Sequence, residues 1–550
     1  MRRAHTVAAV RAAEQALMAT VPEGALMQRA AAGLAATCAT LLDRVYGARV
    51  VVLAGSGDNG GDALYAGARL AARGAAVTAI AVGPRLHAAA AADLVARGGS
   101  VVAATPPAAA PGGNHASDGQ DASDGQDGSD GQDASDGQDA GGGQDAGPGT
   151  APQDVRIAAH ARSAIIAADV VIDGLTGIGG QGGLREPAAT LAGLIEDARR
   201  DGALVVAVDL PSGVDADTGE VTGPALRADV TVTFGTYKPG LLIDPGAECA
   251  GAAELIDIGL GPYLPEAAVV SLQAADVAAM LPHPSAESDK YRRGVLGLVA
   301  GSEQYTGAAV LSAGGAIKAG AGMVRVISAA PAIGVVRDHW PEAVLTTYNP
   351  DQPADAIEAA GRVQAWAIGP GIGTGDTALE LLTTVLDSDV PVLIDADGLT
   401  VLAAHRELLP RRGPTLITPH AGELARLVKA DRNDIEAQRL HYATAAAADL
   451  GITVLLKGST TVIAEPEPSR PTWVNSTGSS WLATAGSGDV LSGLAGSLLA
   501  QGLAPLEAAA VAAYLHGLAG RLAARDAPIG ASDLLAAIPA AIRASTGERA

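Results

Sequence analysis

Asp489 is the residue in the second half of the chain whose surroundings best suit proton chemistry. It follows small residues at 485–488, with Gly488 directly before it, and a charge-free stretch of helical length comes after it. Small residues let backbone N–H groups at a helix N-terminus surround an anion, and the helix dipole favours that charge. A carboxylate fixed there can take a proton from a hydroxyl beside a phosphate. The segment predicts a phosphate-transfer site; the alternative is a glycine-rich turn that packs a core helix.

Two other loops in the same half have the composition of phosphate contacts. One follows a buried strand and reads Lys457-Gly458-Ser459-Thr460-Thr461. Its lysine is placed to neutralise phosphate oxygens. The other is the GPGIG turn, where Gly371 and Gly373 let the backbone approach a bulky ligand. His420, in the TPHAGE segment, is not assigned from spacing, because a lone histidine at a strand end is more often structural.

The first half has a glycine-rich turn after its first strong strand, with the sequence Gly55-Ser56-Gly57-Asp58-Asn59-Gly60-Gly61-Asp62. The turn formally fits G-x-G-x-x-G, but a dinucleotide site wants an acidic residue after the next strand, where Gly83-Pro84 stands. The dinucleotide interpretation is therefore weak. The turn still aims N–H groups at an anion, and its polar side chains are of the type that ligates a cation or moves a proton. Helix capping alone would explain them equally well.

Two further strand ends in this half carry acidic residues followed by glycines. Asp173 begins DGLTGIGGQGG, and Asp209 begins DLPSGVDADTG, with Ser212 three residues later. Ligands of open α/β sheets bind beyond the carboxyl ends of the strands. We therefore expect Asp62, Asp173 and Asp209 to converge on one crevice.

The elements that position these residues follow an α/β pattern. Short Val/Ile/Leu-rich runs that end in glycine-rich turns alternate with Ala/Leu-rich stretches of helical length, which is typical of parallel sheets covered on both faces. The runs are 49–57, 76–83, 169–177, 203–213 and 229–235, then 294–302, 322–328, 365–373, 391–398, 415–420 and 453–464. The proline-marked stretch 281–294 is typical of a junction. We predict two α/β domains, at 1–270 and 285–550.

Composition limits the classes of function. The chain has 550 residues and a formal net charge of −23, which argues against a nucleic-acid partner because such a protein needs a basic face. Its two cysteines cannot form a disulfide framework, which favours a reducing compartment. We find no clean signal peptide and no membrane-spanning stretch, so we expect a cytoplasmic protein with no membrane partner.

One segment differs from the rest of the chain. Between 112 and 149 the chain repeats SDGQDA-like units, with nine Asp and no Lys or Arg. Such a composition cannot bury enough apolar surface to offset chain entropy. We expect a disordered acidic insert at about 108–152; the functional alternatives are an interaction arm or a metal-collecting tract.

The first 260 residues, apart from this insert, resemble the NAD(P)H-hydrate epimerase domain. The resemblance lies in AEQALM (13–18), GSGDNGGDA, DGLTGIGG, VDLPSGVDADTG and FGTYKPGLL (234–242), in the family order. It implies a Rossmann-like domain and a potassium ion held by Asn59, Asp173 and Ser212. The residues implied to contact hydrated NAD(P)H are Asp58, Asn59, Gly60, Gly61, Asp62, Gly177, Ile178, Gly179, Gly180, Gln181, Gly182, Gly183 and Asp209. Asp62 is our candidate proton-transfer group, and Lys238 is a second.

Residues 285–540 resemble the NAD(P)H-hydrate dehydratase branch of the ribokinase-like superfamily. The matching segments are DKYRRGVLGLVAGS (289–302), YTGAAVLSAGGAIKAGAGMVRV (305–326), GPGIG, TPHAGELARL (418–427), LLKGSTTVI and GSGDVLSG (486–493). The resemblance implies that Ala316, Gly371, Gly373, His420 and Asp489 contact the hydrated nucleotide. Residues 457–461 and Gly488 would contact the adenine nucleotide, and Asp489 would be catalytic.

Together the two resemblances imply a bifunctional repair enzyme built from two three-layer α/β domains. The first domain would interconvert the epimers of hydrated NAD(P)H. The second would phosphorylate the S-epimer and eliminate phosphate, with ADP or ATP as donor, Mg²⁺ and K⁺ as metal cofactors, and AMP as the product from ADP. Small molecules are the expected partners, within a homo-oligomer. The alternatives are a ribokinase-like small-molecule kinase with a fused binding module, and a catalytically idle first domain whose acidic arm recruits a partner.

Overall fold

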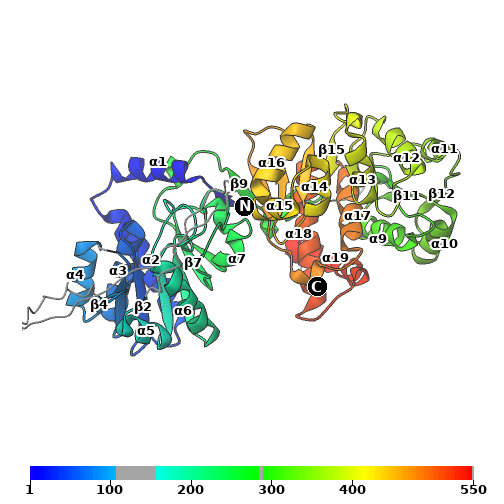
Figure 1. Ribbon diagram of the computed structural model, residues 1–550. Helices are drawn as coiled ribbons and strands as arrows, with labels where there is room; N and C mark the ends of the chain where they lie inside the picture. Colours follow the sequence, from blue (N-terminus) through cyan, green and yellow to red (C-terminus); the bar gives the residue numbers. More distant parts are fainter. Residues whose placement is uncertain (84, 107–155, 284–288, 548–550) are drawn as a thin grey trace, which may run out of the picture.

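The computed structural model describes residues 1–83, 85–106, 156–283 and 289–547, which form two α/β domains side by side (Figure 1). Each domain has a central sheet with helices on both faces, as the alternation of apolar runs and helical stretches predicts. The predicted acidic insert at 108–152 lies outside the described residues.

Within the described residues, the first sheet has seven strands, all parallel, in the order β4-β3-β2-β5-β6-β7-β8. The strands are β2 (Arg49–Ala54), β3 (Ala76–Ala81), β4 (Ser100–Ala103), β5 (Val170–Gly174), β6 (Leu204–Val208), β7 (Val230–Phe234) and β8 (Ala252–Ile256). This is the Rossmann-type order, and it reverses between β2 and β5. The crevice at that reversal is where open sheets bind ligands, and it receives the turn at 55–62 and Asp173.

Helices cover both faces of this sheet and enclose two apolar cores. One face carries α1 (Val7–Met18), α2 (Ala25–Leu41), α3 (Asp58–Ala71) and α4 (Ala88–Ala96). The other carries α5 (Ala159–Ile166) and α6 (Ala188–Arg200). After β7 come the 3₁₀ turn η1 (Pro239–Leu241) and α7 (Gly246–Ala250), and after β8 comes η2 (Gly261–Tyr263). The predicted three-layer Rossmann-like domain is confirmed.

The second sheet has a parallel part and an antiparallel part. The parallel strands are β10 (Val295–Val299), β11 (Met323–Ser328), β12 (Val344–Thr347), β13 (Ala365–Ile368), β14 (Val392–Ile394), β15 (Thr415–Ile417) and β16 (Thr453–Leu456). Beyond β16, β17 (Thr461–Ala464) and β18 (Thr472–Asn475) are antiparallel. The run at 453–464 forms two strands around the turn at 457–460, so the loop expected after a buried strand lies there, and a second strand follows it.

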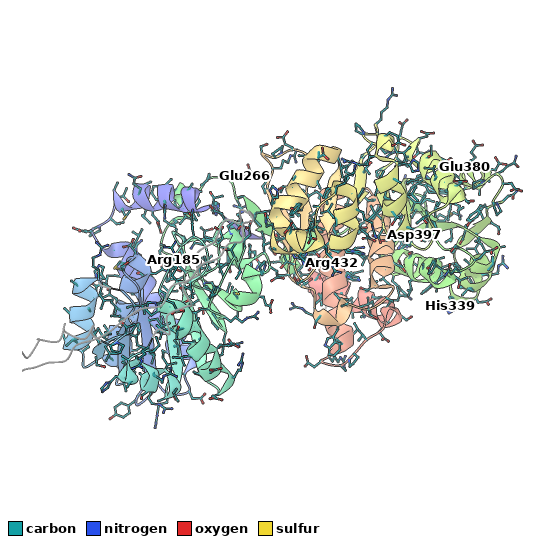
Figure 2. All side chains as sticks on the ribbon, in the orientation of Figure 1. Arg185, Glu266, His339, Glu380, Asp397 and Arg432 are labelled. Carbon is teal, nitrogen blue, oxygen red and sulfur yellow. The ribbon has the colours of Figure 1, made fainter. Side chains whose placement is uncertain are left out.

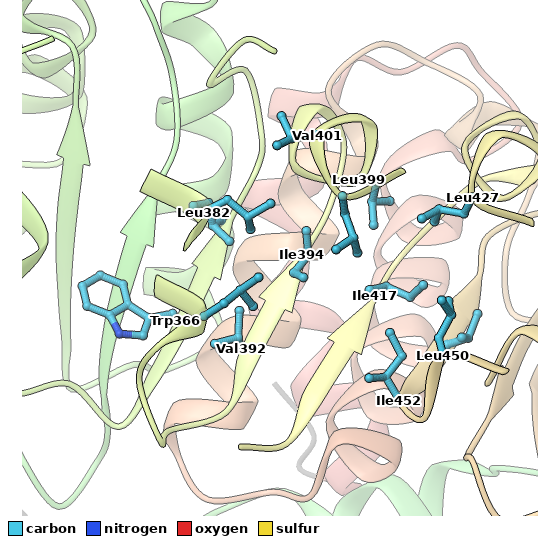
Figure 3. Packing of buried hydrophobic residues seen from close by; sticks show 14 of the residues in the cluster. Trp366, Leu382, Val392, Ile394, Leu399, Val401, Ile417, Leu427, Leu450 and Ile452 are labelled. Carbon is cyan, nitrogen blue, oxygen red and sulfur yellow. The ribbon is translucent and has the colours of Figure 1, made fainter. Parts of the chain in front are cut away.

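Two layers of helices also enclose this sheet. One layer holds α8 (Ala274–Met280), α9 (Thr306–Lys318), α10 (Ala330–His339), α17 (Ser487–Ala500), α18 (Pro505–Ala524) and α19 (Ala531–Thr546). The other holds α11 (Ala354–Ala359), α12 (Asp376–Leu386), α13 (Asp397–Ala404), α14 (Ala421–Val428), α15 (Arg432–Ala437) and α16 (Arg439–Leu450), with η3 (Arg406–Leu408); η4 (Ser480–Leu482) precedes α17. Figure 3 shows Trp366 and Ile394 on the sheet and Leu427 on α14 of the second layer, all three members of the same apolar core.

Two short strands from the start and the middle of the chain extend the second sheet. β1 (Arg2–Ala4) pairs antiparallel with β9 (Val269–Ser271), and β9 pairs with β18. The N-terminus therefore lies at the junction of the domains beside β9 (Figure 1), and its ammonium group is 2.6 Å from a carboxylate oxygen of Asp276. The second sheet therefore includes residues 2–4, although the strands of the first sheet come after them in the chain. No helix in the described ranges has the length and apolarity needed to cross a bilayer.

Close packing of α9 on α17 gives a test of the fold. A Cβ on Gly493 would overlap the carbonyl oxygen of Ser312, so we expect Gly493→Ala to destabilise the second domain by about 1–3 kcal/mol. Gly334→Ala in α10, where the added Cβ meets open space, is the control and should stabilise by up to ~1 kcal/mol. Urea unfolding midpoints measure both; equal midpoints would contradict the packing.

Candidate active sites

Asp173, at the end of β5, is the centre of a buried polar network in the first domain. Its carboxylate accepts hydrogen bonds from the Ser212 N–H at 2.8 Å, the Ser212 hydroxyl at 2.7 Å and the Leu175 N–H at 3.2 Å. The Ser212 Oγ accepts one from the Thr176 N–H at 3.0 Å. Burial raises the pKa of Asp173 to about 6, although these donors favour the charged form.

Asn59 joins this network from the first turn of α3. Its side-chain NH₂ donates to the carbonyl oxygens of Thr176 at 3.1 Å and Val208 at 2.6 Å. Thr176 thus contacts both Asn59 and Ser212. The structure therefore connects Asn59, Asp173 and Ser212 in one hydrogen-bond network, in which Ser212 bonds Asp173 directly and Thr176 links Asn59 to Ser212.

Asp209 and Lys238 form a buried ion pair beside this network. Lys238 is only 1% exposed, and its ammonium also donates to the Thr233 hydroxyl at 3.0 Å and the Phe234 carbonyl at 3.2 Å. Asp209 further accepts from the Phe234 N–H at 3.1 Å, and it takes a φ of 66°, a left-handed conformation that is costly for a residue with a side chain. These bonds hold Asp209 in that conformation.

Asp62 differs from the other carboxylates because its Oδ1 is buried with no hydrogen-bond partner in the described residues. Burial raises its pKa well above the ordinary value, and the negative charges of Asp209, Asp58 and Glu14 add to the shift. Asp58 itself is exposed at the start of α3. A buried carboxyl with a raised pKa holds its proton more strongly than an ordinary aspartate, which suits a group that transfers a proton.

The turn glycines Gly60 and Gly61 are packed inside the domain, whereas part of the loop at 177–183 borders an open space. A Cβ on Gly60 would overlap the carbonyl oxygen of Gly55, so the buried Gly60 and Gly61 serve close packing of the turn. A cavity of about 470 Å³ is lined by Thr176, the segment 180–188 and Gly213. Gln181 and Gly182 are exposed, and Arg185, labelled in Figure 2, lies on this loop. Gly177, Ile178 and Gly179 continue the loop toward α1.

Sequence analysis missed two charged residues of α1 as members of the first site. Arg11 lies against Gly179, since a Cβ there would be 2.7 Å from the Arg11 guanidinium. Burial raises the pKa of Glu14, and Asp209 contributes to that shift while Lys238 opposes it. The available signal is the spacing of Arg11, just before the AEQALM segment, and Glu14 within it, because residues three apart lie on the same face of a helix.

The second site centres on Lys457, at the end of β16. Its ammonium lies 2.7 Å from Asp395 Oδ1 and 3.8 Å from Glu423 Oε2. Burial alone would lower the pKa of Lys457, but these carboxylates outweigh it and the pKa is raised. Asp395 Oδ2 accepts a hydrogen bond from the Ser492 hydroxyl at 2.6 Å. Asp395 was not singled out from the sequence, although it ends the apolar run at 391–398.

Asp489 lies in the first turn of α17, facing this ion pair. Burial raises its pKa to about 7, and the charge of Asp395 adds to the shift while Lys457 opposes it. A Cβ on Gly488 would lie 3.3 Å from the Lys457 ammonium, so that backbone runs directly beside the lysine. His516 Nε2, 3.0 Å from the Ser487 carbonyl oxygen, supports the turn from below.

The other residues predicted for the second site are two turn glycines, a helix-capping histidine and a buried alanine. Gly371 and Gly373 take left-handed φ values of 65° and 79°, and the Gly373 N–H donates to Asp397 Oδ2 at 2.9 Å; Asp397 is labelled in Figure 2. His420 caps α14: its Nδ1 accepts from the Gly422 and Glu423 N–H groups at 3.0 and 3.2 Å, and burial lowers its pKa. Ala316 is fully buried in the helix α9 that packs on α17.

The residues of the turn at 457–460 differ in their exposure to solvent. Gly458 and Ser459 are exposed, and Thr461 begins β17. Thr460 is only 1% exposed, and its hydroxyl donates to Asp244 Oδ2 of the first domain at 2.8 Å.

Comparison with known proteins shows the family. Residues 296–540 match the NAD(P)H-hydrate dehydratase family, and residues 23–240 match the YjeF-related protein N-terminus. The bifunctional NAD(P)H-hydrate repair enzyme Nnr of Mycobacterium leprae is 42% identical, over 99% of this chain and 100% of that protein. The chain belongs to the bifunctional NAD(P)H-hydrate repair enzyme family.

Other proteins are also similar to this chain. The Nnr protein of Mycobacterium tuberculosis is 43% identical over 93% of this chain and 92% of that protein. An ADP/ATP-dependent NAD(P)H-hydrate dehydratase from Bacillus subtilis, crystallised with ATP and Mg²⁺, is 33% identical, covering 50% of this chain and 97% of that one, with a TM-score of 0.46.

The family assignment confirms the bifunctional repair enzyme, with an epimerase domain and an ADP-dependent dehydratase domain, that the two resemblances implied. The alternative of a small-molecule kinase with an idle module is not favoured, because the relatives match both halves.

The Asp209–Lys238 pair gives a test of the first site. Lys238→Met should destabilise the first domain by about 3–5 kcal/mol, because it leaves Asp209 buried without its cation. Arg227→Met, which breaks an exposed pair with Glu248, is the control and should cost no more than about 1 kcal/mol. Denaturant unfolding measures both, and equal effects would show that the buried pair does not hold this site together.

Proposed function

We propose that Asp62 is the proton-transfer group that lets the first domain interconvert the two epimers of hydrated NAD(P)H. The observation that carries this assignment is its buried Oδ1, which lacks a partner and belongs to the helix that follows β2, beside the point where the sheet order reverses. Lys238, the second candidate, is fully committed to Asp209 and two neutral acceptors. We therefore assign Lys238 to positioning Asp209.

The substrate lies in this proposal between the turn at 58–62 and the loop at 177–183. Exposed glycines let the loop backbone approach a dinucleotide, and the cavity of about 470 Å³ beside it has the size of a ligand site. Asp209, held by Lys238, contacts the substrate on the side of β6.

Asn59, Asp173 and Ser212 would hold a potassium ion. The residues fit such an ion, because Asp173 is a buried carboxylate with only neutral donors and two backbone carbonyl oxygens converge on the Asn59 amide beside it. Oxygen ligands with one negative charge suit a hard cation. When bound, the ion would supply a fixed positive charge toward the anionic substrate.

In the second domain we assign Asp489 as the base that removes the proton from the substrate hydroxyl. That hydroxyl oxygen then attacks the terminal phosphorus of the nucleotide, and the bond to the leaving nucleotide breaks, which gives AMP when ADP is the donor. The N-terminus of α17 stabilises the transferring phosphoryl group, and Lys457 neutralises its oxygens. Phosphate then leaves the ring carbon and the adjacent ring carbon gives up a proton, so the electrons of that C–H bond form the ring double bond and NAD(P)H is restored.

Residues 457–461 and Gly488 hold the adenine nucleotide in this proposal, while Gly371, Gly373 and His420 face the hydrated nucleotide and Ala316 supports that surface from within α9. Among the described residues no three His, Cys, Asp or Glu side chains form a metal cluster, so Mg²⁺ would be carried mainly by the nucleotide phosphates. We assign the epimerase to 1–270 and the dehydratase to 285–550, in a cytoplasmic homo-oligomer. Its two cysteines are free and buried, which suits a reducing compartment.

Recovery of dihydronicotinamide absorbance from mixed-epimer hydrated NADH, with ADP, Mg²⁺ and K⁺, tests these assignments. The wild-type protein should recover both epimers faster than they interconvert spontaneously. Asp489→Asn should slow recovery of the S-epimer by about 10²–10⁴-fold. Asp62→Asn should recover the S-epimer normally and then continue at the spontaneous rate. Exposed Asp43→Asn is the control and should match wild type; full recovery with Asp62→Asn would refute the role of Asp62.

The raised pKa of Asp489 predicts the pH dependence of dehydration. Because the base must be deprotonated, kcat/KM should fall about tenfold per pH unit below about 7. Asp395→Asn removes a negative neighbour that raises this pKa, so the acidic limb should move to lower pH. Asp43→Asn should leave the profile in place. An unshifted limb in Asp395→Asn would mean that another group titrates.

A further inference from the structure

Thr460, in the proposed nucleotide loop of the second domain, is bonded to the first domain. Its hydroxyl donates to Asp244 Oδ2 at 2.8 Å, and its Oγ1 lies 3.3 Å from the Asp244 N–H. Thr460 is only 1% exposed, so these contacts satisfy the buried hydroxyl. Asp244 is therefore bound to the turn through both its backbone and its side chain.

The residues before Asp244 anchor it in the second domain. Leu242 and Ile243 are buried, and they belong to the same apolar core as Val462 of β17 and Val474 of β18. Such burial fixes the backbone at 242–244 relative to the hairpin that carries the loop. Asp244 is thus presented to Thr460 by a packed segment.

A second charged group lies at the same contact. Arg439, at the start of α16, donates to the Lys457 carbonyl oxygen at 3.4 Å, and a Cβ on Gly458 would overlap its guanidinium. Burial lowers the pKa of Arg439, and the negative charge of Asp244 opposes this. The carboxylate of Asp244 therefore also offsets the buried positive charge of Arg439, which hydrogen-bonds the backbone of the loop.

From this arrangement we infer that Asp244 of the epimerase domain is a positioning residue for the nucleotide loop of the dehydratase domain. It fixes Thr460 and so holds the exposed backbone of Gly458 and Ser459 in the conformation that receives the nucleotide. The inference rests on the proposed nucleotide site at 457–461. Asp244 does not touch the reacting atoms, so its removal acts on nucleotide binding before it acts on turnover.

The segment also joins the two sites in the chain. Lys238, which holds Asp209 in the first site, lies six residues before Asp244, and η1 and the buried Leu242 and Ile243 fill the interval. The loop that provides Lys238 to the first site thus also provides Asp244 to the second.

The test compares full-length wild type with Asp244→Ala, Thr460→Val and the double variant. Apparent KM for ADP comes from absorbance recovery with the S-epimer, and Kd for ADP from calorimetry. We expect each single variant to raise both about five- to tenfold, with kcat within about twofold of wild type. The double variant should be no worse than the worse single one, because both remove the same bond. Asp244→Asn, which keeps an oxygen acceptor, should lose less than Asp244→Ala.

Asp257→Asn is the control in the same domain. Among the described residues its carboxylate accepts a hydrogen bond from the Gly259 N–H of its own turn, and the KM and Kd of this variant should equal those of wild type. If Asp244→Ala binds ADP within twofold of wild type, or if the two single effects multiply, the inference is wrong. If Asp244→Ala does not fold, the KM and Kd of Thr460→Val test the inference, because this nearly isosteric change removes the same hydrogen bond from its donor. Loss of nucleotide-dependent recovery in wild type would refute the proposed function instead, while the Kd comparison would still decide the role of Asp244.

Discussion

A buried lysine–aspartate pair holds the carboxyl edge of each sheet, and both candidate sites depend on it. In the first domain Lys238 binds Asp209, and in the second Lys457 binds Asp395. Either charge alone would be costly in these surroundings, so each pair forms or fails as a unit. The two lysines come from segments that follow their aspartates by 29 and 62 residues, so each pair ties a later loop to an earlier strand end. The pairs thereby position the loops around them.

The junction of the domains uses the same loops. The Lys238 segment begins at Tyr237, whose carbonyl oxygen accepts from the His5 N–H at 3.0 Å, and His5 Nδ1 lies 2.7 Å from the Thr236 hydroxyl. Because β1 pairs with β9 in the second sheet, α1 starts from that junction and then runs along the first domain (Figure 1). In Figure 2, Glu266 marks the connection just before β9. The two sites are therefore built on one continuous set of contacts.

The sequence predicted those features that local composition determines. The runs at 49–57, 169–177 and 203–213 became β2, β5 and β6, because strands buried on both faces must be continuously apolar. The three-residue strands β1 and β9 could not be found, because their pairing depends on partners about 270 residues apart. The position of Asp489 at a helix start was predictable from the small residues before it. Its neighbours Asp395 and Glu423 were not, because only the fold brings their strand ends together.

The carboxylates at each site divide into two classes according to their partners. Asp209 and Asp395 each bind a lysine directly, so each of these buried carboxylates has an opposite charge beside it. Asp62 and Asp489 lie near those anions, and in the described residues neither has a lysine of its own, so burial and the neighbouring negative charge raise both pKa values. The paired aspartate thus fixes a lysine and also contributes to the raised pKa of its neighbour. The same division arises in both domains because a buried carboxylate without a cation of its own loses its contact with water and also meets the negative charge of the carboxylate beside it.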